Sequence, residues 1–71
     1  MKKNELTEKQ KAILDYIVKF KKENGYAPSF RNIGDAFGIT VKGVSDHLHA
    51  MKKKGWISID EGIARSIVVL P

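Results

Sequence analysis

Hydrophobic residues between positions 7 and 24 recur with the period of a helix. At about 100° per residue, one stripe contains Ile13, Leu14, Ile17 and Phe20. Thr7 and Gln10 have the spacing of a capping box, in which each side chain bonds the other residue's backbone amide. Gly25 suits the left-handed backbone at the end of a helix. The pattern predicts a helix over about residues 7–24.

A second, shorter pattern follows Pro28. Proline disfavours helical backbone at the residue before it, and Ser29 is a favourable N-cap. The apolar residues that then share one face are Phe30, Ile33 and Phe37. Gly38 provides the end, so a helix over about residues 29–37 is predicted. The connection of about three residues to the next helix predicts that the two helices cross steeply.

Residues 41–54 combine a narrow apolar stripe with a polar face. The stripe spans about 80° and consists of Val41, Val44, Leu48 and Met51. The opposite face carries Lys42, Asp46, His49 and Lys53. Thr40 is a favourable N-cap, and the lysines of the last turn complement the helix dipole before Gly55. The segment is predicted to be a helix that docks through one face and leaves the other face free.

After Gly55 the apolar residues alternate, which is the period of a strand. "WISID" places Ile57 and Ile59 on one face, and "RSIVVL" does the same with Ile67 and Val69. The intervening "EGIA" contains a glycine and is typical of a turn. A β-hairpin is predicted over about residues 56–70. Residues 1–71 are therefore predicted to form a single, mainly α domain with a small hairpin.

Composition narrows the class of protein. The 71 residues suffice for one small domain, and the absence of cysteine excludes a disulfide framework and a zinc finger. No apolar run is long enough to span a bilayer, so a soluble, cytoplasmic chain is expected. The net charge of +5 favours a polyanionic partner over a membrane surface, with plain solubility as the alternative.

Nothing in the sequence predicts an enzyme. His47 and His49 lie roughly 200° apart around a helix, so they cannot share a metal or a substrate. The serines lack the surroundings of a nucleophile, and no glycine-rich phosphate loop follows a strand. We therefore expect no catalytic residue, metal, cofactor or small-molecule ligand.

Gly34 and Gly38, in the segment between Ile33 and Val44, indicate a helix-turn-helix. The small Gly34 lets the next helix approach closely, and Gly38 permits a tight turn. An ordinary αα-corner uses the same residues and stays open as an alternative. The +5 charge, the short side chains of the 41–54 helix and the hairpin that follows it favour a winged helix-turn-helix that binds DNA.

Short side chains at the start of the 41–54 helix suit a recognition helix, whose N-terminal residues lie against base edges in the major groove. The candidate base-reading residues are Thr40, Lys42, Gly43, Ser45 and Asp46. Lys42 can donate to guanine O6 and N7, Asp46 can accept from cytosine N4, and Ser45 can do either. For Asp46, a solvated charge or an ion pair with Lys42 is an equal alternative.

Other polar residues are candidates for contact with the DNA backbone. His49 is expected at a phosphate or in solvent, and Lys53 can serve both the helix dipole and a phosphate. Arg65, near the hairpin turn, can reach the minor groove or the backbone, or it can be an exposed arginine without a specific contact. His47, at the edge of the apolar stripe, is expected to be partly buried.

Nearly all of the chain resembles the N-terminal DNA-binding domain of the LexA family of SOS-response repressors, a winged helix-turn-helix. The blocks that carry the resemblance are "LTEKQKAILDYI", "NGYAPSFRNIGDAFGIT", "HLHAMKKKGWISI" and "ARSIVVL". The resemblance implies base contacts from the third helix at the candidates named above. It implies backbone contacts from Ser29, Arg31, Lys53 and Arg65. The chain departs from the family at Val41, where a proline is frequent, and at "NIG", where "EIA" is usual.

The resemblance implies a transcriptional repressor, associated with the nucleoid, that binds double-stranded DNA as a homodimer at a palindromic operator. LexA proteins continue into a self-cleaving Ser–Lys domain, and this chain contains none of it. It is expected to be either the DNA-binding domain of a longer repressor or a free-standing small regulator. A winged helix that binds a protein partner, and a protein that binds nucleic acid without sequence preference, stay open as alternatives.

Overall fold

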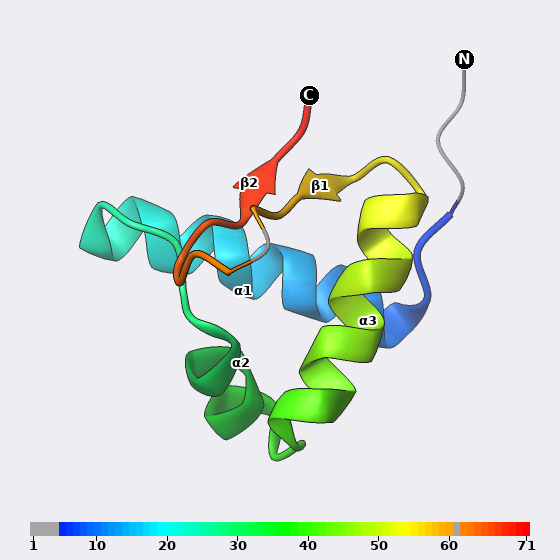
Figure 1. The fold of residues 1–71 in the computed structure, drawn as a ribbon, viewed down its shortest axis with the longest axis horizontal. Coiled ribbons are helices and arrows are strands. Elements are labelled where there is room, and N and C mark those ends of the chain that lie inside the picture. Colours follow the sequence, from blue (N-terminus) through cyan, green and yellow to red (C-terminus); the bar gives the residue numbers. More distant parts are fainter. Residues whose placement is uncertain (1–4, 61) are drawn as a thin grey trace.

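The computed structural model describes residues 5–60 and 62–71, which form three helices followed by a two-stranded antiparallel sheet (Figure 1). The elements in chain order are α1 (Glu8–Asn24), α2 (Phe30–Phe37), α3 (Val41–Lys53), β1 (Ile57–Ser58) and β2 (Val68–Val69). The predicted order of three helices and a hairpin is confirmed. The helix bounds differ from the predicted ones by one residue, because Thr7, Ser29 and Lys54 are cap residues.

Side-chain caps begin all three helices at the residues that the sequence predicted. Thr7 Oγ1 accepts from the Gln10 amide, and the Gln10 side chain accepts from the Thr7 amide, both at 3.2 Å. Ser29 and Asn32 form the same reciprocal pair at the start of α2, with both bonds at 3.0 Å. Thr40 caps α3. Each cap satisfies amides that the first turn of a helix leaves without a partner.

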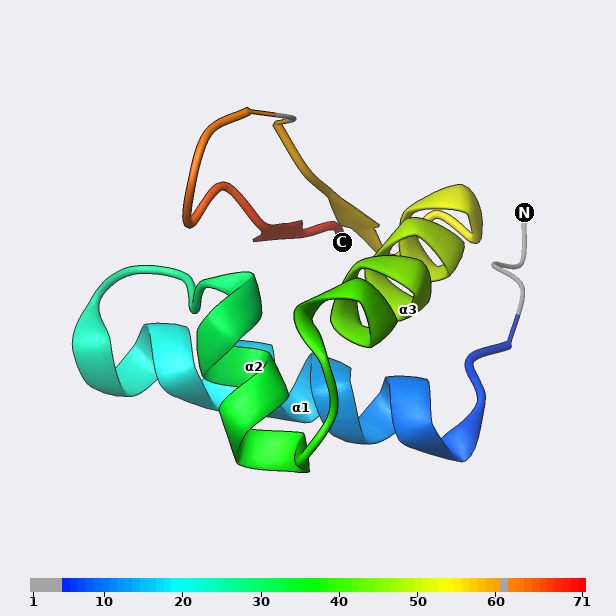
Figure 2. The same cartoon turned by 60° about the horizontal axis from the view of Figure 1, so that its bottom comes forward.

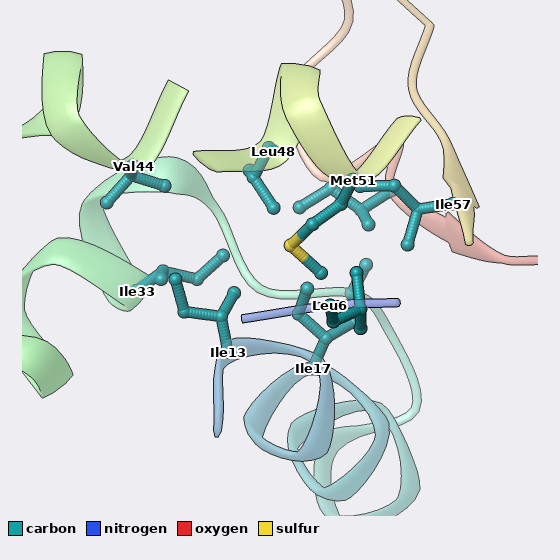
Figure 3. Packing of buried hydrophobic residues seen from close by; sticks show 10 residues of the cluster. Leu6, Ile13, Ile17, Ile33, Val44, Leu48, Met51 and Ile57 are labelled. Atoms are coloured by element: carbon teal, nitrogen blue, oxygen red, sulfur yellow. The ribbon is translucent and has the colours of Figure 1, made fainter. Parts of the chain in front are cut away.

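The core lies where the three helices and the hairpin meet (Figure 3). Its buried residues are Leu6, Ile13, Ile17, Ala27, Ile33, Val44, Leu48, Met51, Ile57 and Ile67. Ile33 and Val44 join α2 to α3, and Met51 extends from α3 toward α1 and the hairpin (Figure 3). The core therefore fixes the docked face of α3 and, with it, the direction of the opposite face.

One predicted member of the apolar stripe of α3 is not in the core. Val41 is 48% exposed, whereas Val44, Leu48 and Met51 are fully buried. Val41 occupies the first turn of α3, where it lies beside the turn of the hairpin and lines a groove there. The N-terminal end of α3 extends past the core, so helical spacing alone predicted a longer buried stripe than the structure has.

The hairpin is confirmed, but its strands are short. Ile57 pairs with Val69 and Ser58 pairs with Val68, and the ladder contains no further residue. The described residues between the strands, 59–60 and 62–67, form a wider turn than the predicted four-residue turn. Glu61, a member of that predicted turn, lies outside the described residues. The Ser66 hydroxyl accepts from the Asp60 amide and donates to the Asp60 carbonyl, both at 3.0 Å, which closes this turn without extending the sheet.

Candidate nucleic-acid interface

The polar face of α3 points away from the core along the whole helix. Lys42, Asp46, His49 and Lys53 are all exposed, at positions that helical geometry places within about 60° of one another. The buried residues of α3 are on the other side. In the view of Figure 2, no other element lies in front of the N-terminal half of α3. The face is thus available over about 16 Å of helix, from Lys42 to Lys53.

Lys42 and Asp46 form an ion pair on this face. Lys42 Nζ lies 3.8 Å from Asp46 Oδ2, and the two side chains are 87% and 71% exposed. The pairing that the sequence left open for Asp46 is therefore present. An exposed pair of this spacing stabilises a helix by only about 0.3–0.5 kcal/mol. Each side chain can consequently leave the other for a stronger partner.

The start of α3 presents little side-chain bulk at Thr40 and Gly43. Thr40 Oγ1 accepts from the Gly43 amide at 3.0 Å, which leaves the hydroxyl hydrogen of Thr40 available for another acceptor. Gly43 has no side chain, and its nearest neighbours from other residues are Thr40 and Ile39. A flat surface of this kind allows close approach of another molecule to the helix backbone.

Ser45 and His49 are linked to each other rather than independent. His49 Nδ1 lies 3.1 Å from Ser45 Oγ and 2.8 Å from the Ser45 carbonyl oxygen. The carbonyl can only accept, so the shorter contact requires a proton on Nδ1. The imidazole is thereby held along α3 with Nε2 directed away from this pair. His47, at the edge of the apolar stripe, is half-buried, as expected.

A groove of about 430 Å³ lies beside the exposed face of α3, between the N-terminal ends of α2 and α3 and the hairpin turn. Ser29, Arg31 and Arg65, three of the predicted backbone contacts, line this groove together with Val41 and Ile63. Ile63 is 59% exposed and was not singled out from the sequence. His49 and Lys53 are not part of the groove, because they lie in the C-terminal half of α3.

The side chain of Arg65 lies against the connection between α1 and α2. Its Nη1 donates to the Ala27 carbonyl at 3.1 Å and to Asn32 Oδ1 at 3.0 Å. Its guanidinium carbon lies 4.7 Å from the centroid of the Tyr26 ring. Nothing in the spacing of the sequence joins these residues, since they are 33 or more positions before Arg65. That Arg65 contacts DNA stays a prediction.

The described part of the chain contains no group of three or more histidine, cysteine, aspartate or glutamate residues placed to bind a metal ion. No helix among the described residues has the length and apolar character needed to cross a membrane. The features that remain are the exposed polar face of α3, the small residues at the start of that helix, and the adjoining groove, which contains Arg31 and Arg65. All of them lie on or beside α3 and the turn of the hairpin.

The fold is a winged helix-turn-helix. Two short helices, α2 and α3, are joined by a tight turn, dock on α1 and are followed by a two-stranded hairpin. In this fold α3 occupies the place of the recognition helix, and the hairpin of β1 and β2 is the wing. A family model described as the LexA DNA binding domain matches residues 3–66. The chain belongs to this family.

Curated relatives agree with this assignment. The chain is 48% identical over 66 residues to the LexA repressor of Leptospira biflexa, which covers 93% of this chain and 33% of that protein. It is 47% identical over 68 residues to the LexA repressor of Pseudothermotoga lettingae (96% and 34%), and 43% identical over 65 residues to that of Myxococcus xanthus (90% and 29%). The chain spans about a third of the length of these relatives.

Proposed function

We propose that the chain binds duplex DNA sequence-specifically, with α3 in the major groove, as the operator-binding module of a LexA-type transcriptional repressor. The observation that carries the proposal is the exposed face of α3, whose side chains contribute nothing to the core. Its first two turns offer Lys42, Ser45 and Asp46 to base edges. Thr40 and Gly43 allow the helix backbone to approach the DNA closely.

The ion pair between Lys42 and Asp46 does not prevent base readout. Breaking an exposed pair of this kind costs about 0.3–0.5 kcal/mol, whereas a good side-chain contact to a base contributes about 1–3 kcal/mol of discrimination. Base contacts therefore outweigh the pair. Lys42 directed to a guanine and Asp46 to the cytosine N4 of a neighbouring pair would use both charges without leaving either one unpartnered.

The backbone contacts in this proposal come from the groove and from the far end of α3. Ser29 and Arg31 lie at the start of α2, where helix amides and the positive end of the dipole favour phosphate. Lys53 and His49 are exposed along α3 and reach a phosphate on the same side of the DNA. The wing lies beside the adjacent backbone, and Arg65, in the turn of the wing, serves this contact from the edge of the groove.

Two copies on a palindromic operator give the affinity that one copy lacks. A single module of this size buries about 600–1,000 Å² against DNA, which is small for a specific complex. A homodimer on two half-sites uses both recognition helices. We propose accordingly that the chain acts at the nucleoid in the cytoplasm, in a DNA-damage (SOS) type of regulon, with dimerisation and any self-cleavage supplied outside residues 1–71.

The test is selection of bound duplexes from a randomised pool, followed by fluorescence anisotropy at two salt concentrations. A palindromic motif with steep salt dependence supports the proposal. Salt-dependent binding without a motif would reduce the function to non-specific binding of nucleic acid. Absence of binding at low salt would favour a winged helix that recognises a protein partner.

Single variants then assign the roles within the interface. Lys42→Ala and Asp46→Asn are expected to change which base is preferred at one position of each half-site, by about 1–3 kcal/mol. Asp46→Asn removes the charge but keeps the shape of the side chain, so a change in preference reports base contact. An unchanged motif in both variants would show that α3 does not read bases through these residues.

A further inference from the structure

Arg65 ties the turn of the wing to a part of the domain that is distant in sequence. Its two hydrogen bonds reach Ala27, in the connection between α1 and α2, and Asn32, in the first turn of α2. Its guanidinium also lies over the ring of Tyr26. One side chain thus makes three contacts across the groove that separates the wing from α2.

The backbone of Arg65 is in a conformation that other contacts must hold. Its φ of 58° is the single positive value among the non-glycine residues of the described ranges 5–60 and 62–71. Arginine has no intrinsic preference for the left-handed region, and such a residue persists where its surroundings hold it there. The bonds to Ala27 and Asn32 and the contact with Tyr26 are the surroundings that do so.

Asn32 connects Arg65 to the cap of α2. The Asn32 side-chain oxygen accepts from the Ser29 amide at 3.0 Å and from Arg65 Nη1 at the same distance. In return, Ser29 Oγ accepts from the Asn32 amide. The wing is thereby bonded to the residue pair that begins α2. The two walls of the groove are held together by a continuous chain of hydrogen bonds.

We propose that Arg65 is a positioning residue, which holds the wing against the start of α2 and acts on DNA binding through the placement of the wing and not by neutralising a phosphate. The DNA part of this inference rests on the proposed function, whereas the tether itself does not. The substitution Arg65→Lys separates the contribution of charge from that of geometry. Lysine keeps the positive charge, but it lacks the planar guanidinium group and stacks less well on an aromatic ring.

The first measurement uses the 71-residue chain without DNA. Amide hydrogen exchange is followed at Ile63, whose amide donates to the Asp60 carbonyl within the wing turn. Arg65→Lys is expected to speed this exchange on the order of tenfold, because two charge-assisted hydrogen bonds and the ring contact are weakened. The matched control is Arg31→Lys, which alters an exposed arginine of the same groove and is expected to leave the exchange unchanged.

The second measurement compares DNA binding of Arg65→Lys and Arg65→Ala on a duplex that carries the selected motif. A positioning role predicts that lysine does not restore the affinity lost in the alanine variant, and that both keep the salt slope of the unchanged protein. A phosphate contact predicts the reverse: lysine restores affinity, and alanine lowers the slope by about 1. The second result would overturn the proposal.

A third variant keeps the experiment decisive if Arg65→Lys does not fold. Tyr26→Leu leaves the arginine in place and removes the ring beneath it, together with the contact of that ring with Phe20. It is therefore expected to speed exchange at Ile63 as well, by a few-fold. Unchanged exchange in both Arg65→Lys and Tyr26→Leu would refute the tether. If the unchanged protein binds no duplex at all, the proposed function fails, and the exchange measurements still decide whether Arg65 holds the wing.

Discussion

A side chain on Gly34 would collide with the backbone at Ile39. A Cβ atom built on Gly34 would lie 2.8 Å from the Ile39 carbonyl oxygen, closer than real Cβ atoms approach other atoms. In the other direction, the Ile39 amide donates to the Gly34 carbonyl at 3.0 Å. The last turn of α2 and the residue before the cap of α3 are therefore in direct backbone contact. This contact sets how closely the two helices of the helix-turn-helix approach.

Gly34→Ala is expected to destabilise the domain by about 1 kcal/mol or more. Alanine gains up to about 1 kcal/mol of helix propensity over glycine, but the collision is with backbone, and overpacking of this kind costs about 1–3 kcal/mol. Urea unfolding followed by circular dichroism measures the difference. Equal or greater stability of the variant would show that the turn relaxes without cost and that Gly34 is not needed for close approach.

Gly43→Ala is the matched substitution, and it is expected to raise the stability of the domain instead of lowering it. A Cβ at Gly43 would lie 3.4 Å from Thr40 Oγ1 and 3.9 Å from Ile39, which α3 accommodates with little movement. The variant is expected to gain up to about 1 kcal/mol in stability from helix propensity. Because Gly43 lies in the proposed interface, the affinity of the variant for the selected duplex is expected to fall. A variant that is more stable and binds DNA equally well would remove Gly43 from the interface.

Two neighbouring lysines at the end of α3 are expected to have different roles. Lys54 Nζ donates to Gln10 Oε1 at 2.8 Å, and Gln10 is only 6% exposed. Lys54→Met should therefore cost about 1 kcal/mol of stability, since a part-buried acceptor loses a charged donor. Lys53 is exposed and belongs to the polar face of α3, so Lys53→Met should leave the stability within about 0.5 kcal/mol.

In DNA binding, the larger effect is expected from Lys53→Met and the smaller one from Lys54→Met. Lys53→Met is expected to weaken binding to all duplexes alike and to lower the salt slope by about 1, as loss of one phosphate contact does. Lys54→Met is expected to bind with an unchanged slope, because Lys54 lies off the polar face of α3 and its ammonium group is held at Gln10. Salt-dependent anisotropy on the two variants measures this, and equal slopes would contradict the assignment of Lys53.

Local signals in the sequence predicted the elements and their ends. The Thr7–Gln10 pair, the N-caps Ser29 and Thr40, and the glycine after α2 act over three or four residues, so they can be found by spacing alone. The order of elements and the buried face of α3 followed from the same kind of pattern, with Val41 as the exception. These features required no knowledge of how distant segments meet.

The contacts between segments that are distant in sequence could not be predicted in the same way. The side chains of Gln10 and Asn32 each complete a local cap and also accept from a basic residue that is distant in sequence, Lys54 or Arg65. The spacing of residues in the sequence predicts the cap, but it does not predict the second bond, to Lys54 or Arg65. The strands were overestimated for a related reason, since alternation at residues 57–59 and 67–69 does not show where the Ser66 side chain interrupts the ladder.

Ser66→Ala is expected to loosen the wing from within. The Ser66 hydroxyl closes the turn by bonding both backbone groups of Asp60, and the alanine variant would leave those groups to water. The global stability should fall by about 1 kcal/mol at most, because the lost bonds are exposed and water replaces them. Exchange at the Ile63 amide should quicken, since its acceptor is the same Asp60 carbonyl. Ser66→Thr keeps the hydroxyl and is the control; exchange as fast as in the alanine variant would mean that the hydroxyl does not hold the turn.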